Sequence, residues 1–353
     1  MRVAQVAMET AHGHDSAGTR RFEQVGHELA AEGHDVTVFC VRWWDGDADE
    51  WTEDGVEYRG VTPGDAVPSF CTRLPASLAR HRPDVIHVRP APAQQVVAAS
   101  IGGSLARAPL VLDWYGDEGL SAENRWTRWA LSRPDCIVTP SEYVRTAVRE
   151  LGANGEAVRV IPEGIDYSLV ETTDPAETVD VVYTHQFDET GNLEDLLLGL
   201  AELRDRDWTA TVIGDGPHRG KYEQQAADLR IADRVDFPGE CNRERRIAAY
   251  RGAHVFVQTA YREQFATELL WALACGCIGI VEYQAESSAH ELIENYDRSY
   301  RVTDPQGLAD AIVDAGAFER WTEDNAWRSH DHSAIVEQYL ATYGDPSTPA
   351  GHR

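Results

Sequence analysis

Short apolar runs alternate with amphipathic segments along the first half of the chain. Residues 3–8 form a short apolar run, residues 19–32 have the spacing of an amphipathic helix that ends at Gly33, and residues 35–41 are apolar and rich in β-branched side chains. Further strand-like runs follow at residues 84–88, 110–114, 136–139 and 158–161, and each pair leaves room for a helix. Such alternation predicts parallel strands joined by right-handed crossovers, and therefore a doubly wound sheet.

The same alternation restarts in the second half, after a polar stretch at residues 163–178 that has the composition of a linker. Strands are predicted at residues 179–183, 209–213, 234–237, 254–259 and 278–283, with helices that begin at Leu193, at Arg219 and near Phe265. The fold class is therefore α/β, with two doubly wound, Rossmann-like domains facing a cleft. A ligand is expected in that cleft, at the carboxyl ends of both sheets.

Two segments do not fit simple alternation. Residues 43–63 form an acidic, glycine-punctuated excursion that is either a hairpin or a long loop, and residues 304–343 have a helical pattern. We divide the chain into an N-terminal domain, residues 1–165, and a C-terminal domain, residues 166–317. A helix over residues 318–343 is expected to pack back on the first domain.

The charge of the chain indicates an unusual solvent. Acidic residues number 59 against 32 basic ones, which gives a formal charge of −27, and Lys221 is the only lysine. Since 42% of the residues are hydrophobic, the chain is a folded protein with an acidic surface, and not a disordered acidic tail. Such a surface resembles that of haloarchaeal cytosolic proteins, whose self-repulsion is screened by salt; an ordinary acidic mesophilic enzyme is the alternative. The negative field disfavours nucleic acid as a partner.

Neither a signal peptide nor a membrane span is expected. Met1 and Arg2 lead directly into an apolar strand pattern, and the longest uncharged stretch, residues 269–281, contains two glycines and is too short to cross a bilayer. The cysteines lack paired metal-ligand spacing. Cys275 and Cys277 are either a redox or metal pair or small buried residues in a turn. These features predict a cytoplasmic protein with at most peripheral membrane contact.

A series of motifs in the second half resembles glycosyltransferase family four. The motifs follow one another in the family's order: residues 159–166 (RVIPEGID), 212–217 (VIGDGP), 233–239 (DRVDFPG), 263–266 (EQFA), 272–277 (ALACGC) and 291–293 (ELI). Residues 33–38, 83–87 and 140–142 of the first half also fit, so the resemblance covers nearly the whole chain. It implies a GT-B fold, an N-terminal acceptor domain, a C-terminal nucleotide-sugar domain, and transfer that retains the anomeric configuration, without a cofactor.

The resemblance places the donor at residues that make physical sense. Phe265, Ala266 and Thr267 begin a helix whose free N–H groups suit a diphosphate. Gly214 and Gly216 would let the backbone approach a nucleobase or ribose, or they form a plain strand-to-helix turn. Glu263 matches the first acid of the family's "Glu, seven residues, Glu" motif, where it would contact the transferred sugar; the alternative is a solvated carboxylate before a helix.

Three donor positions depart from the family. The second acid of the motif is replaced by Trp271, which either packs in the core or stacks on the ligand, and Glu268, one turn earlier, is the candidate substitute. Gln186 and Gly191 stand where the family has an arginine and a lysine for the diphosphate. Candidate replacement cations are His185, His218, Arg219 and the basic residues of 243–246, although the last group also fits a solvated helix face.

The first domain supplies candidates for the acceptor side. Gly18 remains from the family's glycine-rich loop, and Arg20 or Arg21 could meet a phosphate. Tyr115 replaces the family's usual histidine. The nearby acids and tryptophans have two interpretations each: sugar ligands or surface acids for Asp113, Asp117 and Glu118, and core or sugar platform for Trp126 and Trp129. His12, His14 and Asp15 have a metal-like spacing without a third ligand nearby, so no metal is expected.

Three functions compete at this point. The first is a retaining glycosyltransferase that moves a hexose from a nucleotide-sugar donor to a glycan, polyol or lipid-linked acceptor. The second is a catalytically degenerate GT-B protein that acts as a partner or regulatory subunit, as the departures at Gln186, Gly191 and Trp271 suggest. The third is an isomerase such as a nucleotide-sugar epimerase, because fold alone does not fix chemistry.

Overall fold

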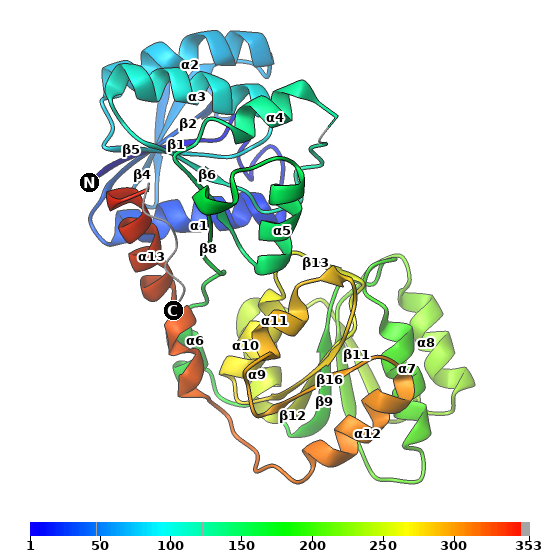
Figure 1. The fold of residues 1–353 in the computed structure, drawn as a ribbon. Helices are drawn as coiled ribbons and strands as arrows, with labels where there is room; N and C mark the ends of the chain where they lie inside the picture. The colour runs from blue at the N-terminus through cyan, green and yellow to red at the C-terminus, as the bar shows by residue number, and fades with distance from the viewer. Residues whose placement is uncertain (47, 122, 347–353) are drawn as a thin grey trace. The chain divides into compact units, whose positions relative to one another are not determined.

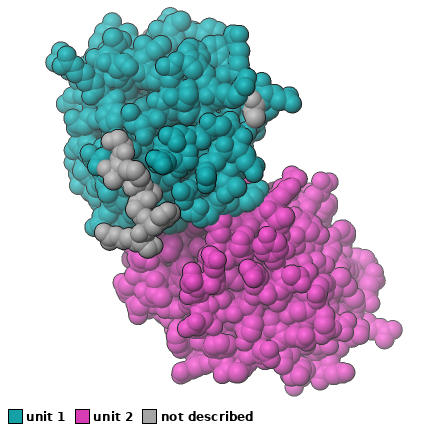
Figure 2. All heavy atoms as spheres, in the orientation of Figure 1, with its two compact units in different colours: residues 1–163, 333–353 teal, residues 164–332 magenta. Residues whose placement is uncertain are grey.

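The computed structural model describes residues 1–46, 48–121 and 123–346. The chain forms two compact units, residues 1–163 with 333–353 and residues 164–332 (Figures 1 and 2). Each unit holds one large sheet between layers of helices (Figure 1). Among the described helices, none has the length and hydrophobicity of a membrane span.

Unit 1 is built on an eight-stranded sheet with the order β3-β4-β2-β1-β5-β6-β7-β8. All neighbouring pairs are parallel except β3 with β4. Its strands are β1 (Arg2–Val6), β2 (Asp35–Val41), β3 (Glu50–Glu53), β4 (Val56–Thr62), β5 (Val85–Val88), β6 (Leu110–Asp113), β7 (Cys136–Thr139) and β8 (Val158–Val160). Its helices are α1 (Ala17–Ala31), α2 (Val67–His81), α3 (Ala93–Ala106), α4 (Arg125–Leu131), α5 (Glu142–Glu150), the 3₁₀ helix η1 (Gly155–Ala157) and α13 (His332–Gly344).

Helices cover both faces of this sheet, as the alternation of the strands predicts. In β1, Ala4 and Val6 pack in one core with residues of α2 and α3, such as Leu74 and Val96. Val3 packs in a second core with residues of α1 and α13. Buried parallel strands present apolar side chains to both layers, which is why they are visible in the sequence as continuous apolar runs.

Unit 2 is built on a six-stranded parallel sheet with the order β11-β10-β9-β12-β14-β16. Its strands are β9 (Val179–Thr184), β10 (Ala210–Ile213), β11 (Val235–Gly239), β12 (Ala253–Gln258), β14 (Ile278–Glu282) and β16 (Ser299–Val302). A separate pair is formed by β13 (Arg262–Glu263) and β15 (Glu286–Ser287). Its helices are α6 (Tyr167–Thr172), α7 (Leu193–Glu202), α8 (Arg219–Asp228), α9 (Arg243–Gly252), α10 (Thr267–Ala274), α11 (Ala289–Ile293), α12 (Pro305–Ala315) and the 3₁₀ helix η2 (Asn325–His330).

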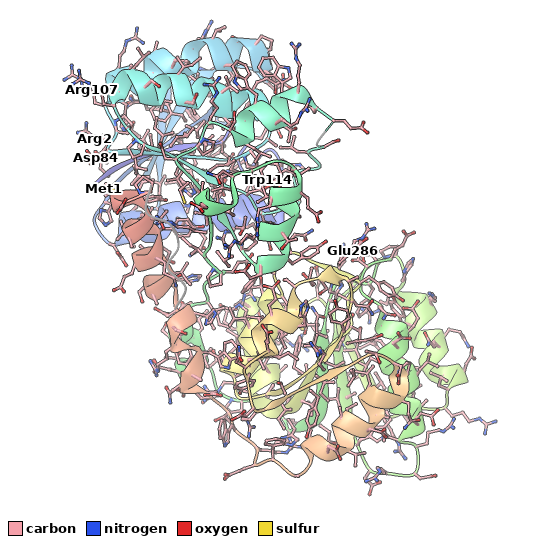
Figure 3. All side chains as sticks on the ribbon, viewed as in Figure 1. Met1, Arg2, Asp84, Arg107, Trp114 and Glu286 are labelled. Atoms are coloured by element: carbon pink, nitrogen blue, oxygen red, sulfur yellow. The ribbon has the colours of Figure 1, made fainter. Side chains whose placement is uncertain are left out.

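The sequence left the excursion at residues 43–63 open, and the structure resolves it as a hairpin. Strands β3 and β4 pair antiparallel, with Trp51 opposite Tyr58, and β4 then joins β2 in parallel. The excursion therefore extends the sheet of unit 1 by two strands. At the amino end of β1 and β5, the backbone N–H of Arg2 donates to Asp84 Oδ2 at 2.7 Å, and Figure 3 shows the two residues side by side.

The predicted linker at residues 163–178 is wrong in part, because α6 occupies its centre. Asp166 caps this helix by accepting from the N–H of Ser168, and Tyr167 and Val170 are buried. Ile165 is fully buried and forms an isolated parallel bridge with Asp331. Three apolar residues in a polar stretch are enough to fix the segment against unit 2.

The predicted helix at residues 318–343 is also wrong as a single element. After α12 ends, the chain is irregular, then forms η2, and only α13 is an α-helix. The irregular part is held on unit 2 through its polar side chains: Arg320 pairs with Asp180, and Asp324 accepts from the Tyr296 hydroxyl. Nearly all of α13 belongs to unit 1, so the chain enters unit 2 once and then returns.

Candidate functional site

Loops converge at the carboxyl edge of the sheet in unit 2. The strands β9, β10 and β12 run parallel and end at Thr184, Ile213 and Gln258. The residues that follow each strand therefore meet at the same edge, which is where open α/β sheets bind ligands. His185 and Gly214 follow the first two strands, and Glu263 lies in the loop that follows the third.

Two glycines at this edge are required by a backbone-to-backbone contact. Gly214 has φ +147°, and a Cβ atom there would lie 2.0 Å from the carbonyl oxygen of His185. Gly216 has φ +150°, and its Cβ would lie 2.5 Å from the carbonyl oxygen of Phe187. The N–H of Phe187 also donates to the carbonyl of Asp215 at 2.9 Å. The turn after β10 is thus closed tightly against the loop after β9, which no other residue type allows.

Glu263 is held in place and is not a freely solvated carboxylate. Its Oε1 atom lies 3.3 Å from His185 Nε2, and Gln258 Nε2 donates to the same atom at 3.3 Å. The residue belongs to β13, which pairs with β15, the strand that carries Glu286 (Figure 3). Its carbonyl accepts from the N–H of Ser288. The first acid of the motif therefore has a fixed position at the sheet edge.

His185 is the charged partner of Glu263. Burial on its own lowers the pKa of the imidazole, but the hydrogen bond and the negative charge of Glu263 outweigh burial, so the pKa of His185 is raised. The ring is mostly buried and its Nδ1 atom lies beside Gly191, whereas it is the backbone carbonyl of His185 that lies against Gly214. The sequence named His185 as one of several candidate cations, and the structure brings it into contact with Glu263.

The start of α10 contributes backbone groups. Ala266 stands at the N-cap position without a side-chain cap, and Phe265 and Ala266 are buried at 5% and 2% exposure. The Phe265 ring packs in a core cluster of unit 2 with Leu269 and Ile213. Thr267, half-buried, is the first helical residue. Any contact of Phe265 with a ligand would therefore come from its backbone.

Glu268 already binds three protein donors. Arg243 and Arg246 each place an Nη1 atom near its Oε1, at 3.0 and 2.6 Å, and the Tyr250 hydroxyl donates to its Oε2 at 2.5 Å. Burial, followed by the charge of Glu268, raises the pKa of Tyr250 well above its ordinary value. Arg243 and Arg246 are therefore ion-paired with Glu268. The alternative interpretation from the sequence, in which they belong to a solvated helix face, is wrong for these two residues.

Trp271 packs in the core. Its exposure is 4%, and the guanidinium carbon of Arg243 lies 5.0 Å from the centre of its ring. The indole thus supports Arg243 through a cation–π contact. Of the two interpretations of Trp271, packing in the core and stacking on the ligand, the structure shows packing in the core.

The absence of a lysine at position 191 has a steric explanation. A Cβ on Gly191 would lie 2.9 Å from both the Gln186 carbonyl oxygen and His185 Nδ1. Its carbonyl accepts from the Tyr183 hydroxyl at 2.5 Å and from Thr259 Oγ1 at 3.2 Å. No lysine fits in this loop as it is folded.

Two further candidate cations have contacts of their own. Arg219 pairs with Glu223 and donates to the Phe237 carbonyl, while the His218 ring meets Tyr222 edge-on.

In unit 1, Gly18 and Tyr115 meet at the carboxyl edge of the sheet. The N–H of Gly18 donates to Asp117 Oδ2 at 2.9 Å, and a Cβ on Gly18 would lie 2.9 Å from Tyr115 Cβ. Glu118 accepts from the backbone N–H groups of Tyr115 and Gly116, at 2.8 Å each. Burial, followed by the charge of Asp117, raises the pKa of Glu118 to about 7.

The two arginines after Gly18 have different environments. Arg20 is exposed and pairs with Asp15 at 2.7 Å. Arg21 is buried and donates to Tyr339 and to the Ile161 carbonyl, at 2.7 Å each, with Asp113 at 3.4 Å. Asp113 is 4% exposed, so its interpretation as a surface acid is wrong. It is the buried counter-ion of Arg21.

Other acceptor-side candidates have structural contacts of their own. Among the described residues, no group of three His, Cys, Asp or Glu side chains could hold a metal ion. His12 instead stacks on Trp43, with ring centres 3.6 Å apart. Trp126 packs against the core of unit 1, whereas Trp129 is 42% exposed.

Two family models match consecutive parts of the chain. One, described as Glycosyltransferase Family 4, matches residues 18–169, and the other, described as Glycosyl transferases group 1, matches residues 170–326. The chain belongs to glycosyltransferase family four.

Individual relatives of this glycosyltransferase agree with that assignment. A 2-deoxystreptamine glucosyltransferase from Streptomyces kanamyceticus is 28% identical over 166 residues, which cover 42% of this chain and 43% of that protein. The match thus spans less than half the length of this curated relative. HepE from Anabaena, solved in complex with UDP, has a TM-score of 0.74 at 18% identity and covers 98% of this chain and 100% of that one. A glycosyltransferase from Rickettsia africae has a TM-score of 0.75 at 15% identity and covers 98% of both chains. The two doubly wound units are thus the Rossmann-like domains of a GT-B fold.

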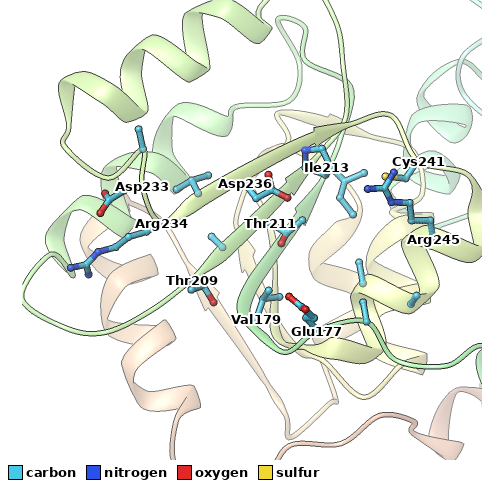
Figure 4. A pocket seen from close by; sticks show the side chains of 17 residues that line it. Glu177, Val179, Thr209, Thr211, Ile213, Asp233, Arg234, Asp236, Cys241 and Arg245 are labelled. Atoms are coloured by element: carbon cyan, nitrogen blue, oxygen red, sulfur yellow. The ribbon is translucent and has the colours of Figure 1, made fainter.

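A groove elsewhere in unit 2 is lined by one of the candidate cations, Arg245, and not by the glycines and the acid of the predicted donor site. It has a volume of about 690 Å³ and runs along β10 and β11 beside α9 and residues 176–179 (Figure 4). Its lining mixes carboxylates and guanidinium groups, among them Asp236 and Arg245, with small apolar side chains. Neither Gly214 nor Glu263 of this glycosyltransferase lines it.

Three groups near these sites were missed from the sequence. Gln258, which donates to Glu263, stands at the end of a strand pattern and shows no sign of a role of its own. His87 and Tyr339 lie among apolar residues of a strand and a helix. Their partners are distant in the chain, so no local spacing signals them. A polar residue inside an otherwise apolar strand was the available hint at Gln258 and His87.

Proposed function

We propose that this enzyme is a retaining glycosyltransferase that moves a hexose from a nucleotide-sugar donor to a glycan, polyol or lipid-linked acceptor. The donor binds unit 2 at the carboxyl edge of its sheet, and unit 1 carries the acceptor. The observation that carries the proposal is the convergence of His185, Gly214 and Glu263 at this edge, beside the start of α10.

Two relatives support a uridine nucleotide and a hexose as the first donor to test. HepE was solved with UDP and also with UDP-glucose, and the Streptomyces relative is named as a glucosyltransferase. These are properties of those proteins. For this chain they favour UDP-hexoses over other nucleotide sugars.

The residues of this edge suit transfer of a sugar. The bond between the anomeric carbon and the diphosphate breaks, and its electron pair leaves on the nucleoside diphosphate. The acceptor hydroxyl forms the new bond on the same face of the sugar, and its proton goes to the diphosphate. Backbone N–H groups at the start of α10 stabilise the growing negative charge, and Glu263 orients the hexose through its hydroxyl groups.

We also propose that the enzyme works in the cytoplasm of an organism that accumulates salt. All six cysteines are free, and the formal charge is −27 with one lysine. Salt screens the mutual repulsion of such a surface.

A donor screen in multimolar KCl tests the proposed function. We expect a nucleotide sugar to raise the melting temperature, because a ligand that binds only the folded state stabilises it. Glu263→Gln should keep donor binding within a few fold in calorimetry and lower kcat by about 100-fold, the size of effect seen when one polar group that acts on the transition state is removed. Glu202→Gln, an exposed change at the end of α7, is the matched control. If no nucleotide or nucleotide sugar binds at millimolar concentration, the chain is instead a degenerate member of the family.

A further inference from the structure

The ring of His185 lies between two groups that can only accept hydrogen bonds. Its Nδ1 atom is 2.8 Å from the carbonyl oxygen of Gln186, and its Nε2 atom is 3.3 Å from Glu263 Oε1. A neutral imidazole has one N–H and one lone pair, so it can satisfy only one of these acceptors. Both contacts are favourable only when both nitrogens carry a hydrogen, and the arrangement is therefore that of an imidazolium.

The charges around the ring favour this cation. Glu263 contacts it directly, and Asp188 in the same loop also raises its pKa. The Tyr183 ring lies 6.5 Å from it, centre to centre, and its hydroxyl donates to Gly191. The arginines named as candidate cations have other acceptors: Arg243 and Arg246 bind Glu268, and Arg219 pairs with Glu223.

The histidine and the glycine at position 191 are linked by geometry. A Cβ on Gly191 would lie 2.9 Å from His185 Nδ1, inside van der Waals contact, so the imidazole occupies the space in which a side chain at position 191 would begin. A lysine at position 191 and the observed His185 ring exclude each other. The loop 185–191 also contains Asp188 and Glu189 and no lysine or arginine. Its single source of positive charge is His185.

We propose that His185 is the positioning cation of the donor site. Its imidazolium holds the Glu263 carboxylate toward the hexose and is the one positive charge of the loop 185–191. This inference rests on the proposed function. It differs from the expectation that arginines of α9 replace the family's cations, because those arginines are already paired with Glu268.

The proposal fixes the direction of the pH dependence. Because the folded-state pKa of His185 is raised, the ion pair is complete at low pH and is lost as the pH rises through that pKa. The neutral ring keeps one N–H, so it can no longer donate to both the Gln186 carbonyl and Glu263, and the carboxylate loses the ion pair that orients it. We expect kcat/KM to fall on this alkaline limb, while the affinity for the donor changes less than kcat.

Kinetics of two variants at position 185 test the role. With UDP-glucose as probe, release of UDP to water requires no acceptor. We expect His185→Gln to lower kcat/KM about tenfold at pH 6 and to remove the alkaline limb, because its amide donates to Glu263 without a titratable charge. His185→Arg should restore part of kcat and shift the limb beyond pH 9. His330→Gln, a histidine of η2, is the control and should keep the pH profile of the parent enzyme. A limb that survives in His185→Gln overturns the proposal.

A second measurement separates this inference from the proposed function. The pKa of His185 can be followed by NMR in the full-length chain without any ligand. We expect it to lie above 6.5 and to fall toward that value in Glu263→Gln. A pKa at or below 6.5, or one that does not respond to Glu263→Gln, overturns the inference even if the enzyme is active. Failure of every nucleotide sugar to bind, with the pKa raised, overturns the proposed function and with it the donor role of His185.

Discussion

The hydroxyl group of Tyr339 in α13 donates to Asp113 Oδ2 at 2.6 Å, although the two residues lie 226 positions apart. Arg21 donates to the same hydroxyl group, and His87 Nε2 lies 3.2 Å from Asp113 Oδ2. Burial on its own raises the pKa of Asp113, but Arg21, His87 and Tyr339 together hold it well below its ordinary value. A buried polar cluster thus attaches the last helix to unit 1.

We predict that Tyr339→Phe lowers the free energy of unfolding by about 1.5–3 kcal/mol, the range for a hydrogen bond to a charged group. Urea denaturation monitored by circular dichroism measures the change. Tyr261→Phe, at a tyrosine that is 45% exposed, should have little effect. Equal stability of Tyr339→Phe and the parent protein would show that α13 is held by its apolar contacts alone.

Gly214 provides a test of the donor edge. The alanine Cβ in Gly214→Ala would lie 2.0 Å from a backbone carbonyl at φ +147°, so the loop after β9 must move. We expect a loss of about 1–3 kcal/mol from backbone strain and a loss of nucleotide-sugar affinity of at least tenfold. Gly220→Ala is the control, because its Cβ meets nothing within 4 Å and it lies inside α8. That substitution should stabilise the protein slightly, since alanine favours a helix more than glycine does.

The role of Glu268 in donor binding stays a prediction. We expect Glu268→Ala to weaken nucleotide-sugar binding about tenfold, since stranding polar groups without their acceptor costs about 1–3 kcal/mol. Trp271→Phe should be mild, because the ring packs in the core. Calorimetric titration of both variants measures this.

Because Arg243, Arg246 and Tyr250 also lose their acceptor in Glu268→Ala, thermal unfolding must accompany the titration. Glu268→Gln keeps the shape and removes the charge. Tight donor binding in a correctly folded Glu268→Ala protein would refute a role for this carboxylate in the donor site.

Glu282 predicts how stability depends on pH. Burial, followed by the charge of Asp195, raises the pKa of this carboxyl from 4.5 to about 8. Between these two values the folded state binds more protons at this group than the unfolded state, so its contribution to stability falls as the pH rises from about 5 to about 8.

We expect Glu282→Gln to flatten this part of a plot of melting temperature against pH and to be more stable than the parent at pH 8. Glu202→Gln, an exposed residue, should leave the slope unchanged. A parent slope that persists in Glu282→Gln would assign it to other groups, of which Glu118 is the first candidate.

The acidic surface predicts that folding depends on salt. With a formal charge of −27 over 353 residues, we expect the melting temperature to fall as KCl is lowered from 3 M to below about 0.5 M. Circular dichroism against KCl concentration measures this, with sucrose as a non-ionic control. An unchanged spectrum and melting temperature from 0.1 to 3 M would refute the halophilic interpretation.

The strands and the order of motifs could be predicted from the sequence because buried parallel strands are continuous apolar runs and the motifs are local. The pairings inside the sites could not. His185 and Glu263 are far apart in the chain and meet only because β9 and β12 are neighbours in the sheet. Likewise, nothing near Asp113 in the sequence indicates Tyr339. The short helix α6 was missed because its stability comes from burial of Tyr167 and Val170 against distant residues.

The place of α13 in unit 1 affects how the protein is made. A ribosome completes residues 1–163 long before it reaches Tyr339, and all of unit 2 is synthesised in between. Many proteins finish their first domain before the second emerges. Here unit 1, which holds Arg21 and Asp113, receives the helix that carries Tyr339 only after all of unit 2 has been synthesised. Synthesis of the second domain is therefore a precondition for completing the first.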